Sequence, residues 1–502
     1  MPSRTRPKIA LIVPIRFAVR GFLESDVYPL LREAADLLII SPFAANESFV
    51  KRYSGNGVRH ALLQHFTPSG AHQHAHVLLD KTMKRHWGFR SYEVIDQLRA
   101  YHNAYKERPP APSMIWRMAR GLWYTPIGIN NRLGLAWLSH RERRLYEKQY
   151  DFSCYEELLA REQPDLVVST SPNRPQEMPI ARAAEKCHIP NIAYILSFDN
   201  ICCYGPCPVR YDHYIVWNDR NKQELMHHYA GIGERNVTIA GPLQFDFYFR
   251  RNRYLVSRDQ WASSLGVVPT HKVLLYAETG RNIAPHETSI VADLARRIRS
   301  LGEAGNVQLV VRSHPMYAPD WWDEVQREFP EIIFSRTNYG RGERSTFNFE
   351  DNVQWEQKDL ALLVNSLSHG DVHWNVSSSM TLDAAYFDRP TVCVAYDPRP
   401  GAPFEGICRG LYGREHYVDI VRSGGAVIAR SAECAWRATL AYLENPALHR
   451  EERRRMLAAY DPFMDGKAAE RTAAAILKCL ATVCAERRHA RRKDTLRRAR
   501  IA

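Results

Sequence analysis

The sequence predicts an α/β protein made of two Rossmann-like, doubly wound domains, each with a parallel sheet. Two observations lead to this fold class. Short apolar runs of β-type residues alternate with helical stretches along most of the chain, and these runs are continuously apolar. Continuous apolar runs are typical of parallel strands that helices cover on both faces. The length of 502 residues exceeds what one core supports and suits two such series.

The predicted strands form one series in each half of the chain. The first series is Lys8–Ile15, Asp36–Ser41, Asp165–Thr170, Asn191–Ser197, His213–Trp217 and Val237–Ala240. The second series is Lys272–Ala277, Val307–Arg312, Ile332–Ser335, Asp371–Val376, Thr391–Ala395 and Ala426–Ile428. Helical stretches between these runs predict two domains of the same class.

The predicted domain boundaries follow these series. An N-terminal domain spans 1–245, a linker 246–265, a C-terminal domain 266–480 and a basic tail 481–502. Between about 50 and 150 the strand rhythm stops, and helical stretches rich in Arg, His, Tyr and Trp take over. We expect a helical insertion on the N-terminal domain there. Its aromatic residues form either an ordinary core or a surface for a large or lipid-linked acceptor.

Composition and cysteine usage predict a cytoplasmic globular protein. Apolar residues make up 45% and charged residues 25% of the chain, and no run is long enough to span a bilayer. The N-terminal MPSRTRPKIALIVPIRF has no signal-peptide core and runs straight into a strand pattern. The ten cysteines follow no repeated spacing, and Cys202, Cys203 and Cys207 have no paired motif to complete a zinc site. We expect free thiols in a reducing compartment.

The formal charge of +13 is concentrated at the end of the chain. Residues 486–500, ERRHARRKDTLRRAR, contain eight Arg or Lys and two acids. Such a tail could bind the anionic inner face of the cell membrane or could be a solvated, disordered end. No nucleic-acid-binding motif accompanies it, so nucleic acid is the least favoured partner.

Three consecutive serines follow a predicted strand in DVHWNVSSSMTLDAAYFDRPTVCVAYDPRP, residues 371–400. A helix start needs one capping hydroxyl, because its first backbone N–H groups have no partner within the helix. Three small residues, Ser377, Ser378 and Ser379, leave room for an anion such as phosphate to approach those N–H groups. A redundant cap with a tight turn is the other interpretation.

Polar residues follow three strands of the second series. Glu278-Thr279-Gly280-Arg281 follows one strand, Arg312-Ser313-His314 ends the next, and Ser377-Ser378-Ser379-Met380-Thr381 follows a third, with Asp383 one helical turn later. Ligands of open α/β sheets bind beyond the carboxyl ends of the strands. Cations and helix N–H groups suit a diphosphate, and a carboxylate suits ribose hydroxyls. Taken singly, each of these residues also has a structural explanation.

Several segments resemble a known family. VLLYAETGR (273–281), VVRSHP (310–315), DVHWNVSSSMTLDAAYFDRPTV (371–392) and DGKAAERTAAAIL (465–477) are similar to segments of GT-B fold glycosyltransferases. More narrowly, they resemble the CDP-glycerol glycerophosphotransferase-like and capsule-polysaccharide transferases of bacteria. RGFLESDVYPLL (20–31) and SFDN (197–200) match more loosely.

The resemblance implies roles for these residues. Arg281, His314 and Ser377–Ser379 would hold the donor phosphates and Asp383 the ribose, with Arg312 and Thr381 in the same donor site. One departure is Glu278-Thr279-Gly280, where the polyol-phosphate enzymes carry a proline and an aromatic residue before the arginine. A nucleotide sugar is therefore as good a candidate donor as CDP-glycerol.

Other chemistries lack their motifs. The sequence has no Asp-X-Asp triplet for a metal-bound diphosphate and no GxxxxGK or GxGxxG loop. We therefore expect a metal-independent, inverting glycosyltransferase without a cofactor, acting between the two domains in bacterial surface polysaccharide synthesis. Alternatives are a CDP-glycerol- or CDP-ribitol-type polyol-phosphate transferase, a nucleotide-sugar epimerase and a non-catalytic scaffold of a polysaccharide assembly at the membrane.

A catalytic base is expected on the acceptor side, in the N-terminal domain. Glu24 lies after the first strand and Asp199 after the strand that begins at Asn191. Glu24 is preferred, because the first βα loop of this fold borders the interdomain cleft. In the structural interpretation, Glu24 offsets a helix dipole and Asp199 forms a turn.

Overall fold

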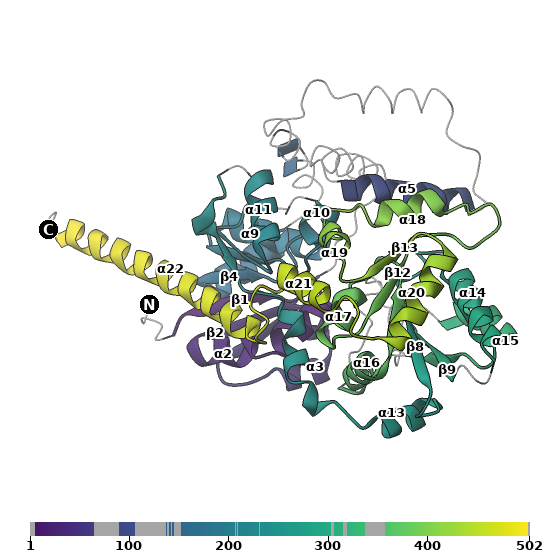
Figure 1. The fold of residues 1–502 in the computed structure, drawn as a ribbon. Helices are drawn as coiled ribbons and strands as arrows, with labels where there is room; N and C mark the ends of the chain where they lie inside the picture. Colours follow the sequence, from purple (N-terminus) through teal and green to yellow (C-terminus); the bar gives the residue numbers. More distant parts are fainter. Residues whose placement is uncertain are drawn as a thin grey trace. The chain divides into compact units, whose positions relative to one another are not determined.

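The protein is described by a computed structural model, drawn in Figure 1. It covers residues 6–64, 90–105, 152–205, 209–229, 231–302, 306–314, 319–336 and 357–499, together with positions 137, 140, 141, 143, 144 and 207. These residues fall into two compact units. Unit 1 contains the described residues up to Asp246, apart from 90–105, and residues 465–499. Unit 2 contains residues 90–105 and Phe247–Met464.

Unit 1 is built around a seven-stranded parallel sheet with the order β3-β2-β1-β4-β5-β6-β7. Its strands are β1 (Lys8–Ile12), β2 (Asp36–Ser41), β3 (Val58–Leu62), β4 (Leu166–Ser169), β5 (Asn191–Tyr194), β6 (His213–Val216) and β7 (Val237–Ile239). Its α-helices include α1 (Arg16–Ala18), α2 (Val27–Ala34), α3 (Glu47–Arg52), α8 (Ser153–Glu162), α9 (Met178–Lys186), α10 (Asn200–Tyr204), α11 (Asp219–His228) and α22 (Ala468–Ala499). The edge strand β3 was not predicted, because its residues are only partly buried and do not form an apolar run.

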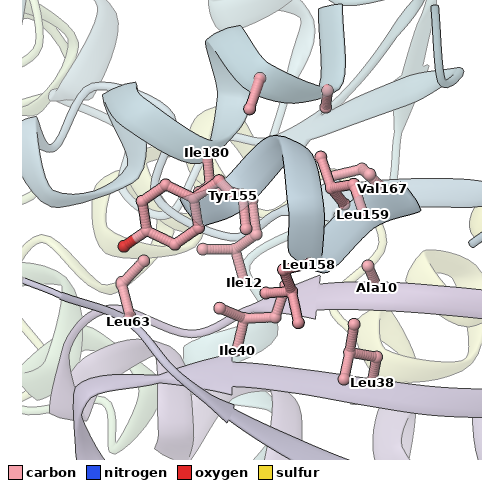
Figure 2. Close-up of a cluster of buried hydrophobic side chains, with 12 residues drawn as sticks. Ala10, Ile12, Leu38, Ile40, Leu63, Tyr155, Leu158, Leu159, Val167 and Ile180 are labelled. Atoms are coloured by element: carbon pink, nitrogen blue, oxygen red, sulfur yellow. The ribbon is translucent and has the colours of Figure 1, made fainter. Parts of the chain in front are cut away.

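The core of unit 1 lies between the sheet and the helices α8 and α9. Figure 2 shows strand side chains facing those of the helices, and the labelled set is Ala10, Ile12, Leu38, Ile40, Leu63, Tyr155, Leu158, Leu159, Val167 and Ile180. None of these side chains is more than 8% exposed. Full burial of a large aliphatic or aromatic side chain contributes about 1.5–3 kcal/mol, so this layer holds the strands in register.

Unit 2 is built around a six-stranded parallel sheet with the order β10-β9-β8-β11-β12-β13. Its strands are β8 (Lys272–Ala277), β9 (Val307–Arg312), β10 (Ile333–Ser335), β11 (Val372–Asn375), β12 (Thr391–Val394) and β13 (Val427–Ala429). Its main helices are α5 (Arg90–Tyr105), α13 (Arg258–Leu265), α14 (Glu287–Ser300), α15 (Asp323–Glu328), α16 (Gln357–His369), α17 (Met380–Tyr386), α18 (Glu405–Leu411), α19 (Val418–Ser423), α20 (Ala432–Glu444) and α21 (Arg450–Tyr460). All six strands of the second predicted series are present.

The two sheets share one topology, which confirms the predicted fold class. In each sheet the chain moves outward from a central strand in one direction, then crosses back and continues in the other direction. The reversal lies between β1 and β4 in unit 1 and between β8 and β11 in unit 2. Such switch points open a crevice at the carboxyl ends of the two central strands, where ligands of this fold bind.

The helix α22 groups with unit 1 rather than with the second domain, to which its first residues were assigned by prediction. The Asp246 carboxylate accepts hydrogen bonds from the backbone of Ala468 (3.0 Å) and Ala469 (2.7 Å). Arg471 Nε donates to the carbonyl of Ala240 at 2.8 Å. These contacts cap the start of α22 on unit 1. The chain passes into unit 2 at Phe247, so most of the predicted linker belongs to that unit.

The helix α5 was predicted as part of an insertion on the N-terminal domain but packs in unit 2. Its Tyr101 ring meets the Phe404 ring edge-on at 5.0 Å. Val94 lies so close to Gly410 that a Cβ there would be 3.3 Å from it. The rest of the predicted insertion lies mostly outside the described residues. No helix in the described part of the chain has both the length and the apolar character needed to cross a bilayer.

Candidate functional site

The predicted donor residues of unit 2 lie at the switch point between β8 and β11 and at the neighbouring end of β9. This follows directly from the strand order, because parallel strands end at one edge of the sheet. The two loops at the switch point are joined, since Thr279 Oγ1 donates to the carbonyl of Val376 at 2.9 Å.

Ser377, which was predicted to bind phosphate, is buried within the fold. Its backbone lies in the left-handed region at φ 47°. Its N–H donates to the Tyr412 hydroxyl at 3.0 Å, and its hydroxyl accepts from Arg414 Nη2 at 2.8 Å. A non-glycine residue in this region costs conformational energy that the surroundings must offset. Ser377 therefore sets the course of the loop, and its polar groups are already engaged.

The next two serines differ in accessibility. The Ser378 N–H donates to Asn375 Oδ1 at 3.1 Å, and its hydroxyl accepts from the Met380 N–H at 3.3 Å. Ser379 is exposed at the N-cap of the seven-residue helix α17, which its side chain does not cap. Among the described residues, neither the N–H nor the hydroxyl of Ser379 has a hydrogen-bond partner. Of the three serines, Ser379 is the one whose groups are open to a ligand.

Thr381 and Asp383 point into the protein. The Thr381 hydroxyl is fully buried and lies 2.8 Å from the Tyr417 hydroxyl, within a network that includes Asn375. A ligand could reach Thr381, as predicted for the donor site, only by displacing part of this network. The Asp383 carboxylate is 8% exposed and accepts a hydrogen bond from the Tyr248 hydroxyl. It thereby ties the start of unit 2 to α17.

The loop after β8 is organised by a buried carboxyl that the sequence argument missed. Glu287, on the first turn of α14, accepts from the backbone of Thr279 (2.8 Å) and Gly280 (3.1 Å) and from the Tyr276 hydroxyl (3.0 Å). Burial raises the pKa of Glu287 to about 8, and the nearby Glu278 carboxylate adds to this. Gly280 takes a φ of 112°, which side-chain-bearing residues rarely adopt. The loop course is therefore fixed before any ligand binds.

A second buried carboxyl joins the β8 and β9 loops. Glu278 Oε2 accepts from the backbone N–H of His314 at 2.9 Å and from Trp322 Nε1 at 3.0 Å. Its pKa is raised because burial disfavours the charged form. The departure from the family pattern at this position therefore has a structural role.

The three predicted basic residues differ in how they could meet an anion. Arg281 is partly exposed, pairs with Asp320 at 3.2 Å and lies over the Trp321 ring. Arg312 is 5% exposed at the end of β9. Burial, together with the charge of Arg312, lowers the pKa of His314 to about 4. His314 is therefore neutral at pH 7 and would offer a hydrogen bond without a charge, unlike the cation that the sequence predicted.

On unit 1, Glu24 follows a short π-helix (Val19–Leu23) and is tightly engaged. Its Oε1 accepts from Arg16 at 2.9 Å and from the Tyr53 hydroxyl at 3.1 Å, and Arg52 lies 3.5 Å away. Burial and the adjacent Glu24 carboxylate raise the pKa of Tyr53 to about 12, so this hydroxyl stays a donor. A general base must be able to take up a proton, and Oε1 is already occupied.

Asp199 lies in a less crowded position. It is the N-cap residue of α10, but its side chain does not cap the helix. Its carboxylate accepts from Asn200 Nδ2 at 3.3 Å, which is its sole hydrogen bond in the described part of the chain. The turn-forming interpretation would require a backbone N–H as partner, and none is present among these residues.

Glu177, which was not predicted from the sequence, organises the β4 loop at the switch point of unit 1. Glu177 is fully buried, accepts from the Ser171 N–H at 2.8 Å and accepts from the Ser169 hydroxyl. Burial raises its pKa well above the usual range. Glutamates are common at helix starts. The sequence therefore does not mark Glu177 or Glu287 as a buried residue that organises a loop.

Known structures share the architecture. No protein-family model and no curated protein matches this sequence. The co-structure of S. aureus MnaA with UDP is 13% identical with a TM-score of 0.52, covering 95% of this chain and 97% of that one. UDP-GlcNAc 2-epimerase from Neisseria meningitidis, bound to UDP-GlcNAc, is 11% identical with a TM-score of 0.51, covering 94% and 100%. The Methanocaldococcus jannaschii epimerase is 12% identical with a TM-score of 0.50, covering 94% and 99%. These likenesses show the GT-B type of fold.

Proposed function

We propose that this protein is a metal-independent, inverting glycosyltransferase that moves a sugar from a nucleotide-activated donor to a glycan or lipid-linked acceptor. The nucleotide would bind unit 2 at the β8/β11 switch point. The resemblance of the sequence to capsule-polysaccharide transferases suggests that the product is a bacterial surface polysaccharide.

The observation that carries this proposal is that Arg281 and the exposed Ser379 lie on the two loops that follow the adjacent strands β8 and β11. A leaving diphosphate must be stabilised by opposite charge and by hydrogen-bond donors when no metal assists. Arg281 supplies the charge, and Ser379 supplies an open N–H and hydroxyl. Arg312 and the neutral His314 support the same edge of the sheet. For Asp383 to bind ribose, it would have to share or release its bond with Tyr248.

A nucleotide-sugar epimerase is the second candidate. The structures of two UDP-GlcNAc 2-epimerases match the fold over 94% of this chain. An epimerase acts on the donor sugar alone, whereas a transferase releases nucleotide only when an acceptor is present. The two functions therefore differ in a measurable requirement.

A nucleotide screen followed by a turnover assay tests both functions. UDP, CDP, GDP and CMP are compared by thermal shift, because a ligand that binds the native state raises its melting temperature. The UDP-sugar, CDP-glycerol or other donor of the best nucleotide is then incubated with and without a glycan acceptor, in EDTA. Acceptor-dependent nucleotide release in EDTA supports the proposal.

Each other result has a defined meaning. Formation of a 2-epimer without acceptor identifies an epimerase, and turnover of CDP-glycerol alone identifies a polyol-phosphate transferase. Stabilisation without turnover of any donor favours a non-catalytic scaffold. Activity that EDTA abolishes and a divalent cation restores contradicts metal independence.

We further propose that the basic tail attaches the enzyme to anionic membranes. Clustered Arg and Lys near such a surface contribute about 1 kcal/mol each. Removal of residues 486–502 should weaken sedimentation with phosphatidylserine vesicles and leave turnover of soluble substrates unchanged. Equal sedimentation of the truncated and full-length proteins would contradict this role.

A further inference from the structure

The loop after β4 lies at the switch point of unit 1, and hydrogen bonds within its own backbone hold its shape. The Arg174 N–H donates to the Ser171 carbonyl at 2.9 Å, and the Glu177 N–H donates to the Arg174 carbonyl at 3.1 Å. The Glu177 carboxylate accepts a hydrogen bond from the Ser171 N–H. Residues 171–177 are thus a compact turn whose backbone and one buried carboxyl are satisfied internally.

Three side-chain atoms of this turn are buried and have no hydrogen-bond partner among the residues that the structure describes. They are Ser171 Oγ, Asn173 Oδ1 and Gln176 Oε1. Ser171 is 3% and Gln176 4% exposed. The orientation of the Asn173 amide is settled, because its Nδ2 donates to the Gly205 carbonyl at 2.7 Å. A buried polar atom without a partner costs about 1–3 kcal/mol, so three in one turn call for an explanation.

We infer that this turn is a binding site for the neutral, hydroxyl-bearing part of a substrate, such as a sugar ring. Two of the three atoms are amide carbonyl oxygens, which only accept hydrogen bonds, and the third is a hydroxyl. Sugar hydroxyls donate to carbonyl oxygens, whereas a phosphate would place oxygen against oxygen. The inference rests on the proposed function, which supplies a sugar or glycan substrate. Because the atoms are covered, a sugar reaches them only after the covering side chains move.

A structural role for the same atoms predicts different behaviour. If buried water satisfied them, removing the Ser171 hydroxyl would destabilise the fold. If they await a ligand, Ser171→Ala loses no native partner and its melting temperature stays equal or rises. Ser169→Ala is the matched control, because the Ser169 hydroxyl bonds both Glu177 and Tyr211 and its loss must lower the melting temperature.

Saturation-transfer NMR on the full chain tests the site with UDP present. The probes are neutral methyl glycosides of glucose, galactose, mannose and N-acetylglucosamine, with glycerol 3-phosphate as the anionic comparison. The wild type should give transfer to at least one glycoside and little to glycerol 3-phosphate. Ser171→Ala and Gln176→Leu should each weaken that signal about 2- to 10-fold, the effect of one neutral hydrogen bond. Gln223→Leu, on the exposed face of α11, should leave it unchanged.

The inference is overturned if no glycoside gives a signal, if glycerol 3-phosphate binds equally well, or if both variants bind like the wild type. It is also overturned if Ser171→Ala is destabilised as much as Ser169→Ala. The proposed function is tested separately. It fails if no nucleotide raises the melting temperature in the thermal-shift screen. A glycoside signal that persists without nucleotide binding would leave the sugar site standing alone.

Discussion

The switch points of the two units share one sheet topology but differ in the polar groups that their loops present. At β8/β11, the donating groups are Arg281, which is partly exposed and paired with Asp320, and the N–H and hydroxyl of Ser379, which have no partner among the described residues. At β4 in unit 1, the buried groups left without partners are mostly carbonyl oxygens, which accept. In both units a buried glutamate, Glu287 or Glu177, consumes the backbone N–H groups of a loop. The shared fold therefore fixes where a ligand lies, and the loop side chains decide which part of it binds.

This difference implies that the two loops suit different chemical groups of a substrate. The donating edge suits a diphosphate, and the accepting turn suits sugar hydroxyls. The consumed N–H groups also show why three serines in a row do not make three donors. Ser377 and Ser378 spend their N–H groups on Tyr412 and Asn375.

The largest expected effect concerns the catalytic base of unit 1. The engaged Oε1 of Glu24 favours Asp199 as the base, although the sequence argument placed Glu24 first. Asp199→Asn should lower turnover by about 10²–10⁴-fold with donor affinity unchanged, the usual effect of removing a general base. Glu24→Gln should lower turnover less and reduce stability through Arg16 and Tyr53. Single-turnover rates and donor titrations separate the two, and the reverse ranking would return the role to Glu24.

The next effect concerns the donating edge of unit 2. Arg281→Ala should weaken nucleotide binding about 10- to 150-fold, the loss of one charge-assisted hydrogen bond. Asp320→Asn should strengthen binding, because Asp320 competes for the same guanidinium. Arg296→Ala is the control, since Arg296 on α14 forms an exposed pair with Glu328 on α15. Titration calorimetry with the stabilising nucleotide measures all three. Unchanged affinity in Arg281→Ala would place the phosphates elsewhere.

Much of the fold could be predicted because it depends on local apolar runs. All six runs of the second half became strands, since each is an apolar run, including the edge strands β10 and β13 that are only partly buried. The edge strand β3 was missed because its residues do not form an apolar run. The grouping of α5 and α22 could not be predicted either, because it depends on contacts such as Asp246 with Ala468 that are far apart in sequence.

Less of the candidate site was predictable. The strand ends are placed by topology, so Arg281 and Ser379 could be assigned to one edge. The hydrogen bonding and protonation of each group depend on its neighbours in space, which the sequence does not reveal. Arg414 reaches Ser377 across 37 residues, and desolvation makes His314 neutral. The sequence does not reveal whether a single polar residue near a turn is buried. For this reason neither Glu177 nor Glu287 was predicted.

A smaller effect tests whether Glu287 organises the β8 loop as a buried acid. Its pKa in the folded protein is about 8, above the ordinary value of 4.5, so the folded state holds the proton more tightly. Its contribution to stability is therefore fully present below pH 4.5 and is lost as the pH rises through about 8, at up to about 1.4 kcal/mol per pH unit. Glu287→Gln should be less stable at low pH, because one backbone N–H loses its acceptor, and its urea midpoint should vary less between pH 5 and 8. Parallel curves for both proteins would contradict this.

In unit 2, the helix α5, which comes from a distant part of the chain, is fastened beside the serine loop. The Glu415 carboxylate accepts from the backbone N–H of Arg90 (2.5 Å) and Ser91 (2.9 Å) and from the Ser91 hydroxyl (2.6 Å). It thus caps α5 from outside the helix. Glu415 directly follows Arg414, which holds the left-handed Ser377. The start of α5 and the serine loop are therefore fastened to one short segment.

The smallest expected effect tests this cap. Glu415→Gln keeps one acceptor oxygen but places an amide N–H₂ against a donor, which should cost about 0.5–2 kcal/mol, the range for a lost helix cap. Amide exchange in residues 90–105 should accelerate by the corresponding factor, while exchange in the β4 loop of unit 1 stays unchanged. Glu451→Gln, which removes an exposed pair with Arg454 on α21, is the matched control and should leave α5 unaffected. Unchanged exchange in α5 would contradict the cap. The contacts of Tyr101 with Phe404 and of Val94 near Gly410 would then be sufficient to hold the helix.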